Sequence, residues 1–122
     1  MNRLLIIATL LLPFSALADH MDVIEFTLKD GCSFSQYMEI VDDFNDDWGK
    51  KKGYKAEIAV PIQSENLVHM FWVGRTADAA TFGKVWDTWR DELLDADSTA
   101  AKLWSRFQAC EDNLSRRGYD VY

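Results

Sequence analysis

The side chains best suited to chemistry lie in and just after one apolar run, residues 67–73. His69 sits in the middle of this run, and an imidazole there can act as a general base or as an axial ligand to haem iron. A buried or interface histidine with a satisfied hydrogen bond fits the same position. The sequence identifies no partner that would complete a catalytic set around His69.

Two further candidates lie close to His69 in the sequence. Arg75 follows the apolar run, and its guanidinium suits recognition of a carboxylate or an oxyanion at the mouth of a cleft. A surface ion pair is the alternative for Arg75. Trp72 and Phe71 are the candidate ligand-binding residues, because aromatic side chains line both pockets and interfaces.

The chain has two cysteines, Cys32 and Cys110. An even number of widely spaced cysteines in an exported protein favours a structural disulfide. Redox-active pairs usually have the spacing Cys-x-x-Cys, which is absent here. We therefore expect Cys32 and Cys110 to be joined.

No motif for a metal or for nucleotide phosphates is evident. The acidic stretch 42–49 partly follows a calcium-binding loop, but Trp48 and Tyr54 replace the glycine and glutamate that such a loop requires. A solvated acidic helix face accounts for it better. We expect no metal and no cofactor, and the net charge of −7 argues against binding to nucleic acid.

The first residues have the pattern of a secretory signal peptide. Arg3 precedes the apolar stretch 4–12, and Ala16-Leu17-Ala18 provides small residues at a cleavage site. We expect cleavage between Ala18 and Asp19, which divides the chain into a signal peptide (1–18) and a single α+β domain (19–122). The expected location is periplasmic or secreted, with no membrane attachment after cleavage.

Alternation of apolar and polar residues predicts strands over 22–28 and 54–62, and the run 67–73 is typical of a central strand buried on both faces.

Ser33 and Gln36 form a capping box for a first helix. Thr76 or Asp78 is expected to cap a second helix. Gly83 within this helix indicates close packing of the helix against its neighbours. After a break at 95–98, capped by Asp97 or Ser98, a third helix extends through Leu103, Trp104, Phe107, Cys110 and Leu114. We expect it to end at 116–118 and a short strand to follow at 119–122.

The order strand, helix, strand, strand, one or two helices, strand is the ferredoxin-like pattern. It predicts an antiparallel sheet with helices on one face only. Because the run 67–73 is apolar on both sides, we expect the other face to meet a second copy of the chain in a face-to-face homodimer.

This layout, with the segment 71–76 followed by Phe82-Gly83, resembles the dimeric α/β-barrel superfamily. That superfamily includes domains similar to antibiotic-biosynthesis monooxygenases and the stress-responsive barrel domains, and the chain resembles an uncharacterised exported bacterial member. The resemblance implies the ferredoxin-like fold. It covers cofactor-free monooxygenases, haem enzymes, isomerases and domains without known activity, so it hardly narrows the function.

Three functions follow from these patterns. The main expectation is an exported homodimer that binds a small apolar ligand or a protein partner without catalysis. The alternative is a cofactor-free monooxygenase-like or isomerase-like enzyme with His69, Trp72 and Arg75 at its cavity. A haem-binding protein with His69 as axial ligand is the third.

Overall fold

The computed structural model describes residues 18–122, which form a single four-stranded antiparallel sheet in the order β2-β3-β1-β4. The strands are β1 (Asp19–Leu28), β2 (Lys55–Ala59), β3 (Met70–Thr76) and β4 (Glu111–Val121). The predicted signal peptide lies almost entirely at 1–17, outside the described residues. No helix in the described part is long and apolar enough to cross a membrane.

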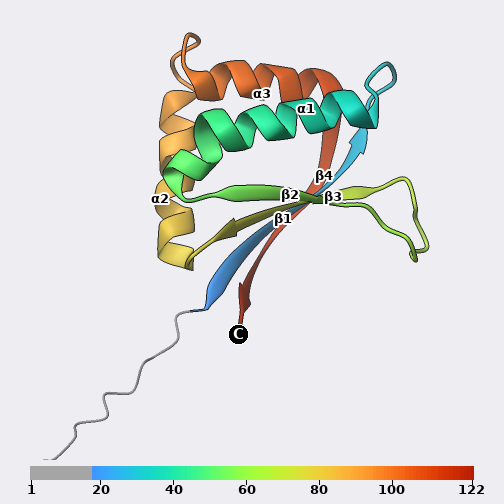
Figure 1. Ribbon diagram of the computed structural model, residues 1–122, viewed down its shortest axis with the longest axis horizontal. Coiled ribbons are helices and arrows are strands. Elements are labelled where there is room, and N and C mark those ends of the chain that lie inside the picture. The colour runs from blue at the N-terminus through green and yellow to red at the C-terminus, as the bar shows by residue number, and fades with distance from the viewer. Residues whose placement is uncertain (1–17) are drawn as a thin grey trace, which may run out of the picture.

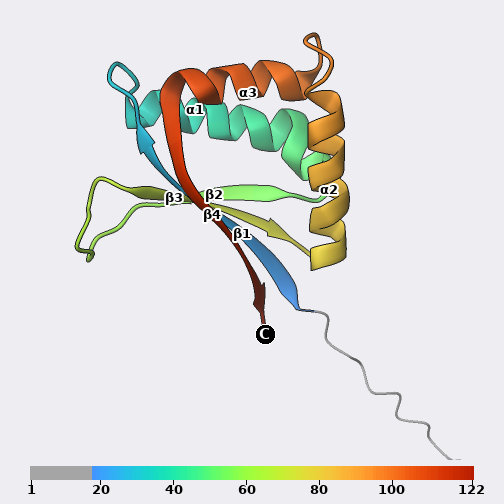
Figure 2. The ribbon, with the colours of Figure 1, turned by 180° about the vertical axis from the view of Figure 1, so that it is seen from behind.

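The helices cover one face and one end of this sheet. Helices α1 (Phe34–Phe44) and α3 (Thr99–Cys110) lie side by side over the face, and α2 (Ala79–Glu92) stands across one end (Figures 1 and 2). A π-helical turn, η1 (Asn45–Gly49), and a 3₁₀ turn, η2 (Lys50–Lys52), continue α1. The predicted α+β, ferredoxin-like arrangement with helices on one face is confirmed.

The helix starts follow the local sequence signals. The Ser33–Gln36 capping box is present, Asp78 caps α2 through the amide of Thr81, and Ser98 caps α3 through the amide of Ala101. Each cap satisfies an amide that the first helical turn leaves without an internal partner. These signals act over three residues, so they can be recognised from the local sequence alone.

The predicted strand at 67–73 is displaced. β3 begins at Met70, while Leu67 and Val68 lie in the exposed loop between β2 and β3 with 61% and 71% of their surfaces accessible. β3 starts at Met70 because its pairing with β1 starts there, opposite Phe26. The expected burial of 67–73 on both faces was therefore wrong at its first half.

The end of the third helix was also misplaced. α3 ends at Cys110, and the chain turns at once into β4, so Leu114 lies on a strand. β4 pairs with β1 along its whole length, with a register shift opposite Glu25 and Phe26. This long-range pairing overrides the helical spacing that Leu114 continues.

Two glycines in the elements have opposite environments. A Cβ on Gly74 in β3 would lie 1.7 Å from the Tyr54 hydroxyl, so only glycine leaves room for that ring. A Cβ on Gly83 in α2 would meet nothing within 4 Å. The close packing expected at Gly83 is absent.

Candidate ligand cavity

The space between the sheet and the helices contains a cavity of about 200 Å³. β1, β3 and β4 form its floor, and α1, α2 and α3 form its walls. Its lining is overwhelmingly apolar, with Glu111, Asn113 and Arg116 of β4 among its few polar residues.

All five tryptophans of the chain line this cavity: Trp48, Trp72, Trp86, Trp89 and Trp104. The Phe44 ring sits among them, with its centroid 5.0 Å from Trp72 and 5.7 Å from Trp89. Among the tryptophans, only Trp72 was singled out from the sequence as a ligand-binding candidate. Trp86 and Trp104 are only half-buried and also line the cavity.

A chain of hydrogen bonds runs beneath the cavity floor. The Trp72 indole N–H donates to the Tyr54 hydroxyl at 2.6 Å, and that hydroxyl donates to Asp22 Oδ2 at 2.9 Å. Burial, followed by the negative charge of Asp22, raises the pKa of Tyr54 well above its usual range. Tyr54 therefore stays protonated and keeps its donor role.

Arg116 completes this chain from β4. Its Nε and Nη2 atoms donate to the two oxygens of Asp22 at 2.8 and 2.6 Å, which is a bidentate pair. The guanidinium carbon also lies 3.9 Å from the centroid of the Trp86 ring, a cation–π contact. Asp22 leaves Nη1 of Arg116 uncommitted, so Arg116 retains a donor at the cavity wall.

Glu111 is the second polar group of interest. Burial raises the pKa of its carboxyl to about 7, although the neighbouring Tyr37 hydroxyl stabilises the carboxylate. Tyr37 is fully buried, and its hydroxyl makes no well-formed hydrogen bond. The cavity therefore contains a carboxyl group that exchanges its proton near neutral pH.

Other candidates from the sequence lie on the opposite side of the sheet. His69 Nδ1 lies 2.7 Å from Glu25 Oε1, and the other oxygen of Glu25 accepts a hydrogen bond from Ser115. Arg75 Nε lies 3.5 Å from Glu57 Oε2. Phe71 is half-buried on the same face of the sheet, which no helix covers. Of the four residues singled out around 69–75, only Trp72 lines the cavity.

Two further features concern the cysteines and possible metal ligands. Cys32 and Cys110 form the predicted disulfide, which ties the start of α1 to the end of α3 beside Glu111. Within residues 18–122 no group of three side chains is arranged to hold a metal ion.

Sequence reasoning missed Asp22, Arg116 and Glu111. Asp22 carried a signal, since strand alternation places it on the same side as Ile24 and Phe26, where an acid needs a partner. Arg116 and Glu111 carried none, because residues 111–118 were assigned to a helix and its end.

Comparison with solved structures decides the fold. SnoaB, a cofactor-independent oxygenase from Streptomyces nogalater, superposes with a TM-score of 0.57 over 86% of this chain and 94% of that chain, at 8% identity. A conserved protein from Methanosarcina mazei Go1 superposes with a TM-score of 0.59 over 91% of this chain and all of the other, at 12% identity. The fold is ferredoxin-like. This is the fold that the resemblance to the dimeric α/β-barrel superfamily implied, and at such low identity the likeness concerns the fold alone.

No protein-family model matches the sequence, and a search of curated proteins also finds no match. The ferredoxin-like chain therefore has to be interpreted from its own cavity and surfaces.

Proposed function

We propose that this protein is an exported homodimeric domain that binds a small aromatic or apolar molecule in the tryptophan-lined cavity. The observation that carries the proposal is the gathering of all five tryptophans around one space of about 200 Å³. An apolar cavity of roughly 150 Å³ holds benzene in other proteins, so this one has room for one or two rings.

The polar groups of the cavity suit orientation of such a ligand. Asp22 fixes Arg116 through two hydrogen bonds, and Trp86 stacks on its guanidinium. The free donor of Arg116 is thus held in place before a ligand arrives, which lowers the entropy lost on binding. A few fixed polar groups in an apolar lining are typical of small-molecule sites.

Binding is tested by the indole N–H signals of the five tryptophans in an ¹⁵N-labelled sample, with toluene as the probe. We expect several indole signals to shift on saturation. Leu93→Trp, which fills part of the cavity, is expected to weaken binding at least 10-fold. Leu94→Trp is the matched control, because Leu94 is the next residue and is 89% exposed. Unchanged signals at saturating toluene would exclude the binding site.

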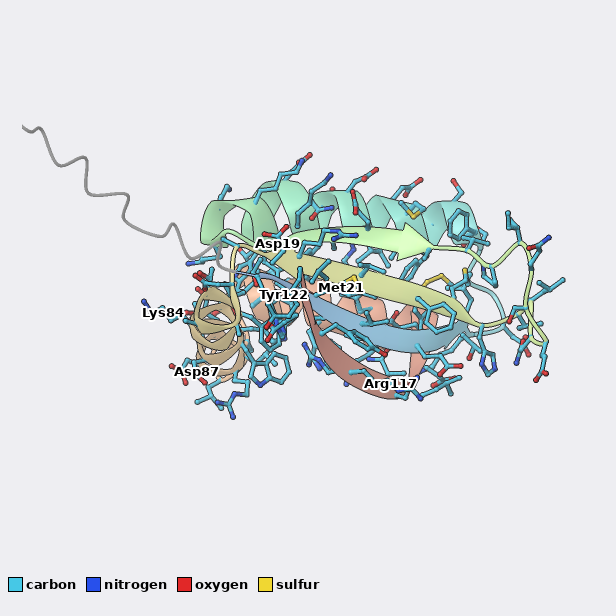
Figure 3. The ribbon with its side chains drawn as sticks, turned by 90° about the horizontal axis from the view of Figure 1, so that it is seen from below. Asp19, Met21, Lys84, Asp87, Arg117 and Tyr122 are labelled. Carbon is cyan, nitrogen blue, oxygen red and sulfur yellow. A yellow bond between two sulfur atoms is a disulfide. The ribbon has the colours of Figure 1, made fainter. Side chains whose placement is uncertain are left out.

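The uncovered face of the sheet supports the homodimer. Its centre carries Met21, Val23 and Val73, all half-buried, and charged residues of both signs surround them: Glu25, Lys55, Glu57, Arg75 and Arg117. Figure 3 views this face, on which Met21 and Arg117 are labelled. An apolar centre within a rim of mixed charge is complementary to a second copy of itself.

Sedimentation at micromolar concentration tests the dimer. We expect the native chain to sediment as a dimer and Val73→Glu to sediment as a monomer with its fold retained. Ile62→Glu makes the same kind of change in the exposed loop between β2 and β3, and it is expected to remain dimeric. A native chain that sediments as a monomer contradicts the proposal.

Export is supported by the leader-like sequence at 1–18 and by the Cys32–Cys110 disulfide, which persists best in oxidising compartments. Intact and native mass spectrometry of protein recovered from the periplasm of an expression host tests this part. We expect a chain that begins at Asp19, a mass two hydrogens below the reduced form, and a retained small molecule. A full-length chain in the cytoplasm would contradict export.

A cofactor-free oxygenase is the second candidate. Its support is the fold shared with SnoaB, together with Glu111, whose carboxyl has a pKa of about 7 within the cavity. A carboxylate poised near neutral pH can accept a proton from a bound phenol and leave it more reactive toward dioxygen. Oxygen uptake with 1-naphthol, present in the native protein and lost in Glu111→Gln, would favour this candidate over simple binding.

A further inference from the structure

Glu111 occupies an unusual position in the wall of the cavity. It is the first residue of β4, directly after the disulfide-bonded Cys110, and it lines both the tryptophan-lined cavity and a second hollow beside it. Within residues 18–122 its carboxyl forms neither a salt bridge nor a well-formed hydrogen bond.

The charged groups around Glu111 leave it without a counter-ion. Lys29, at the end of β1, is engaged by Asp112 at 3.6 Å and by the carbonyl oxygen of Gln108 at 2.6 Å. Asp112 adds a like charge, which disfavours the carboxylate of Glu111. From α1 only the neutral Tyr37 hydroxyl faces it, and from α3 the neighbours are Trp104 and Gln108.

These surroundings favour a neutral carboxylic acid below neutral pH. Desolvation, as the largest cause, raises the pKa of Glu111 to about 7. A neutral carboxyl has one O–H donor, whereas a carboxylate only accepts hydrogen bonds. Asp22 and Arg116 are already paired with each other, so neither is the partner of Glu111.

We propose that the protonated carboxyl of Glu111 donates a hydrogen bond to an acceptor oxygen of the cavity ligand, so that the site selects small aryl carbonyl compounds over hydrocarbons of the same shape. This inference rests on the proposed function, since it concerns the same cavity. The β4 positions of Glu111 and Arg116 are five residues apart, or roughly 15 Å of strand, which allows a ligand of one or two rings between their side chains.

Acetophenone and α-methylstyrene are the probes that test this selection. They have nearly the same shape, and the hydrocarbon carries a CH₂ group where the ketone carries its oxygen. Affinities are measured by the indole N–H signals at pH 5.5 and at pH 8.5. We expect the ketone to bind about 2- to 10-fold more tightly at pH 5.5, as one net hydrogen bond provides. At pH 8.5 the preference is expected to disappear, because the carboxylate no longer donates.

Two variants of Glu111 separate its donor role from its shape. Glu111→Gln keeps a neutral donor, so the preference for the ketone is expected to persist at both pH values. Glu111→Leu removes the donor, so the preference for the ketone is expected to be lost at both pH values, because the buried carbonyl oxygen then has no partner. Glu39→Gln is the matched control, since it makes the same change at an exposed position of α1 that does not line the cavity, and it is expected to retain the pH-dependent preference.

The outcomes distinguish this inference from the function on which it rests. If neither probe binds at either pH, the binding cavity itself is wrong. If both bind with equal affinity at pH 5.5, or if the preference survives Glu111→Leu, the cavity stands and the role of Glu111 is overturned.

Discussion

Asp22 and Glu25 are acids on the same strand, β1, but they face opposite sides of the sheet. Asp22 is 2% exposed on the covered side and binds Arg116 and Tyr54. Glu25 lies on the uncovered side, where its hydrogen bond with His69 is the main reason its pKa is lowered. The covered carboxylate is enclosed and holds three elements together, whereas the uncovered one is part of a solvated cluster.

This difference between the two faces shows that residue types alone do not predict which polar cluster lies at the cavity. His69, Glu25 and Ser115 include the groups that catalysis commonly uses, yet they lie on the uncovered face. Arg116 and Tyr54 on the covered face were not singled out from the sequence, yet both line the cavity and bind Asp22. Burial separates these two sets, and it depends on strand pairing between distant parts of the chain.

The largest expected effect concerns the disulfide that holds the covered side together. Replacing Cys32 and Cys110 by serine is expected to lower the free energy of unfolding by about 4 kcal/mol, because the bridge closes a loop with a sequence separation of 78. Urea denaturation measures the change. Adding a reductant to the native protein should reproduce it, and an unchanged midpoint would contradict this account.

The comparison of the two acids is tested directly by paired substitutions. Asp22→Asn is expected to lower the free energy of unfolding by about 3 kcal/mol, since it removes the buried charge that pairs with Arg116 and accepts from Tyr54. Glu25→Gln is the control on the uncovered face, and its unfolding midpoint should barely move. Equal losses in the two variants would show that the faces do not differ as described.

The packing of the covered face is tested by two glycines. Gly74→Ala is expected to destabilise the protein by about 2 kcal/mol, because its Cβ would displace the Tyr54 ring. Gly83→Ala, in an open position of α2, is expected to stabilise it by about 0.5–1 kcal/mol through helix propensity. Thermal unfolding ranks the two variants against the native chain, and a gain for Gly74→Ala would contradict the packing.

The last effect is the contribution of Glu111 to the pH dependence of stability. Its pKa is about 7 in the folded protein, above the ordinary value of 4.5, so the folded state binds the proton more tightly. This contribution is fully present below pH 4.5 and is lost as the pH rises through 7. Glu111→Gln should lose less stability than the native protein between pH 5 and pH 8, as measured by urea denaturation at each pH.

Local signals in the sequence predicted much of the fold. The capping residues Ser33, Asp78 and Ser98 were identified because a cap involves only neighbouring residues. Alternation along β1 assigned Ile24 and Phe26 to one face for the same reason. The disulfide followed from the number and spacing of the cysteines.

The candidate site was predicted less well, because β4 has no pattern of its own. Its residues pair with β1, a strand from the other end of the chain, and this pairing brings Arg116 and Glu111 to the cavity. Trp72 was identified because it lies in a clear strand. His69 and Arg75 were grouped with it by proximity in sequence, although adjacent positions of a strand face opposite sides.

The pairing of β1 with β4 also bears on how the chain is made. Asp19 at the start of β1 lies opposite Val121, so the first and last strands are neighbours in the sheet. While the chain is being synthesised, β1 therefore lacks one of its two partners until β4 has left the ribosome. A sheet that closes only with the last strand folds slowly, since its contacts join residues far apart in sequence. The sheet is therefore completed late, after every other strand has been synthesised.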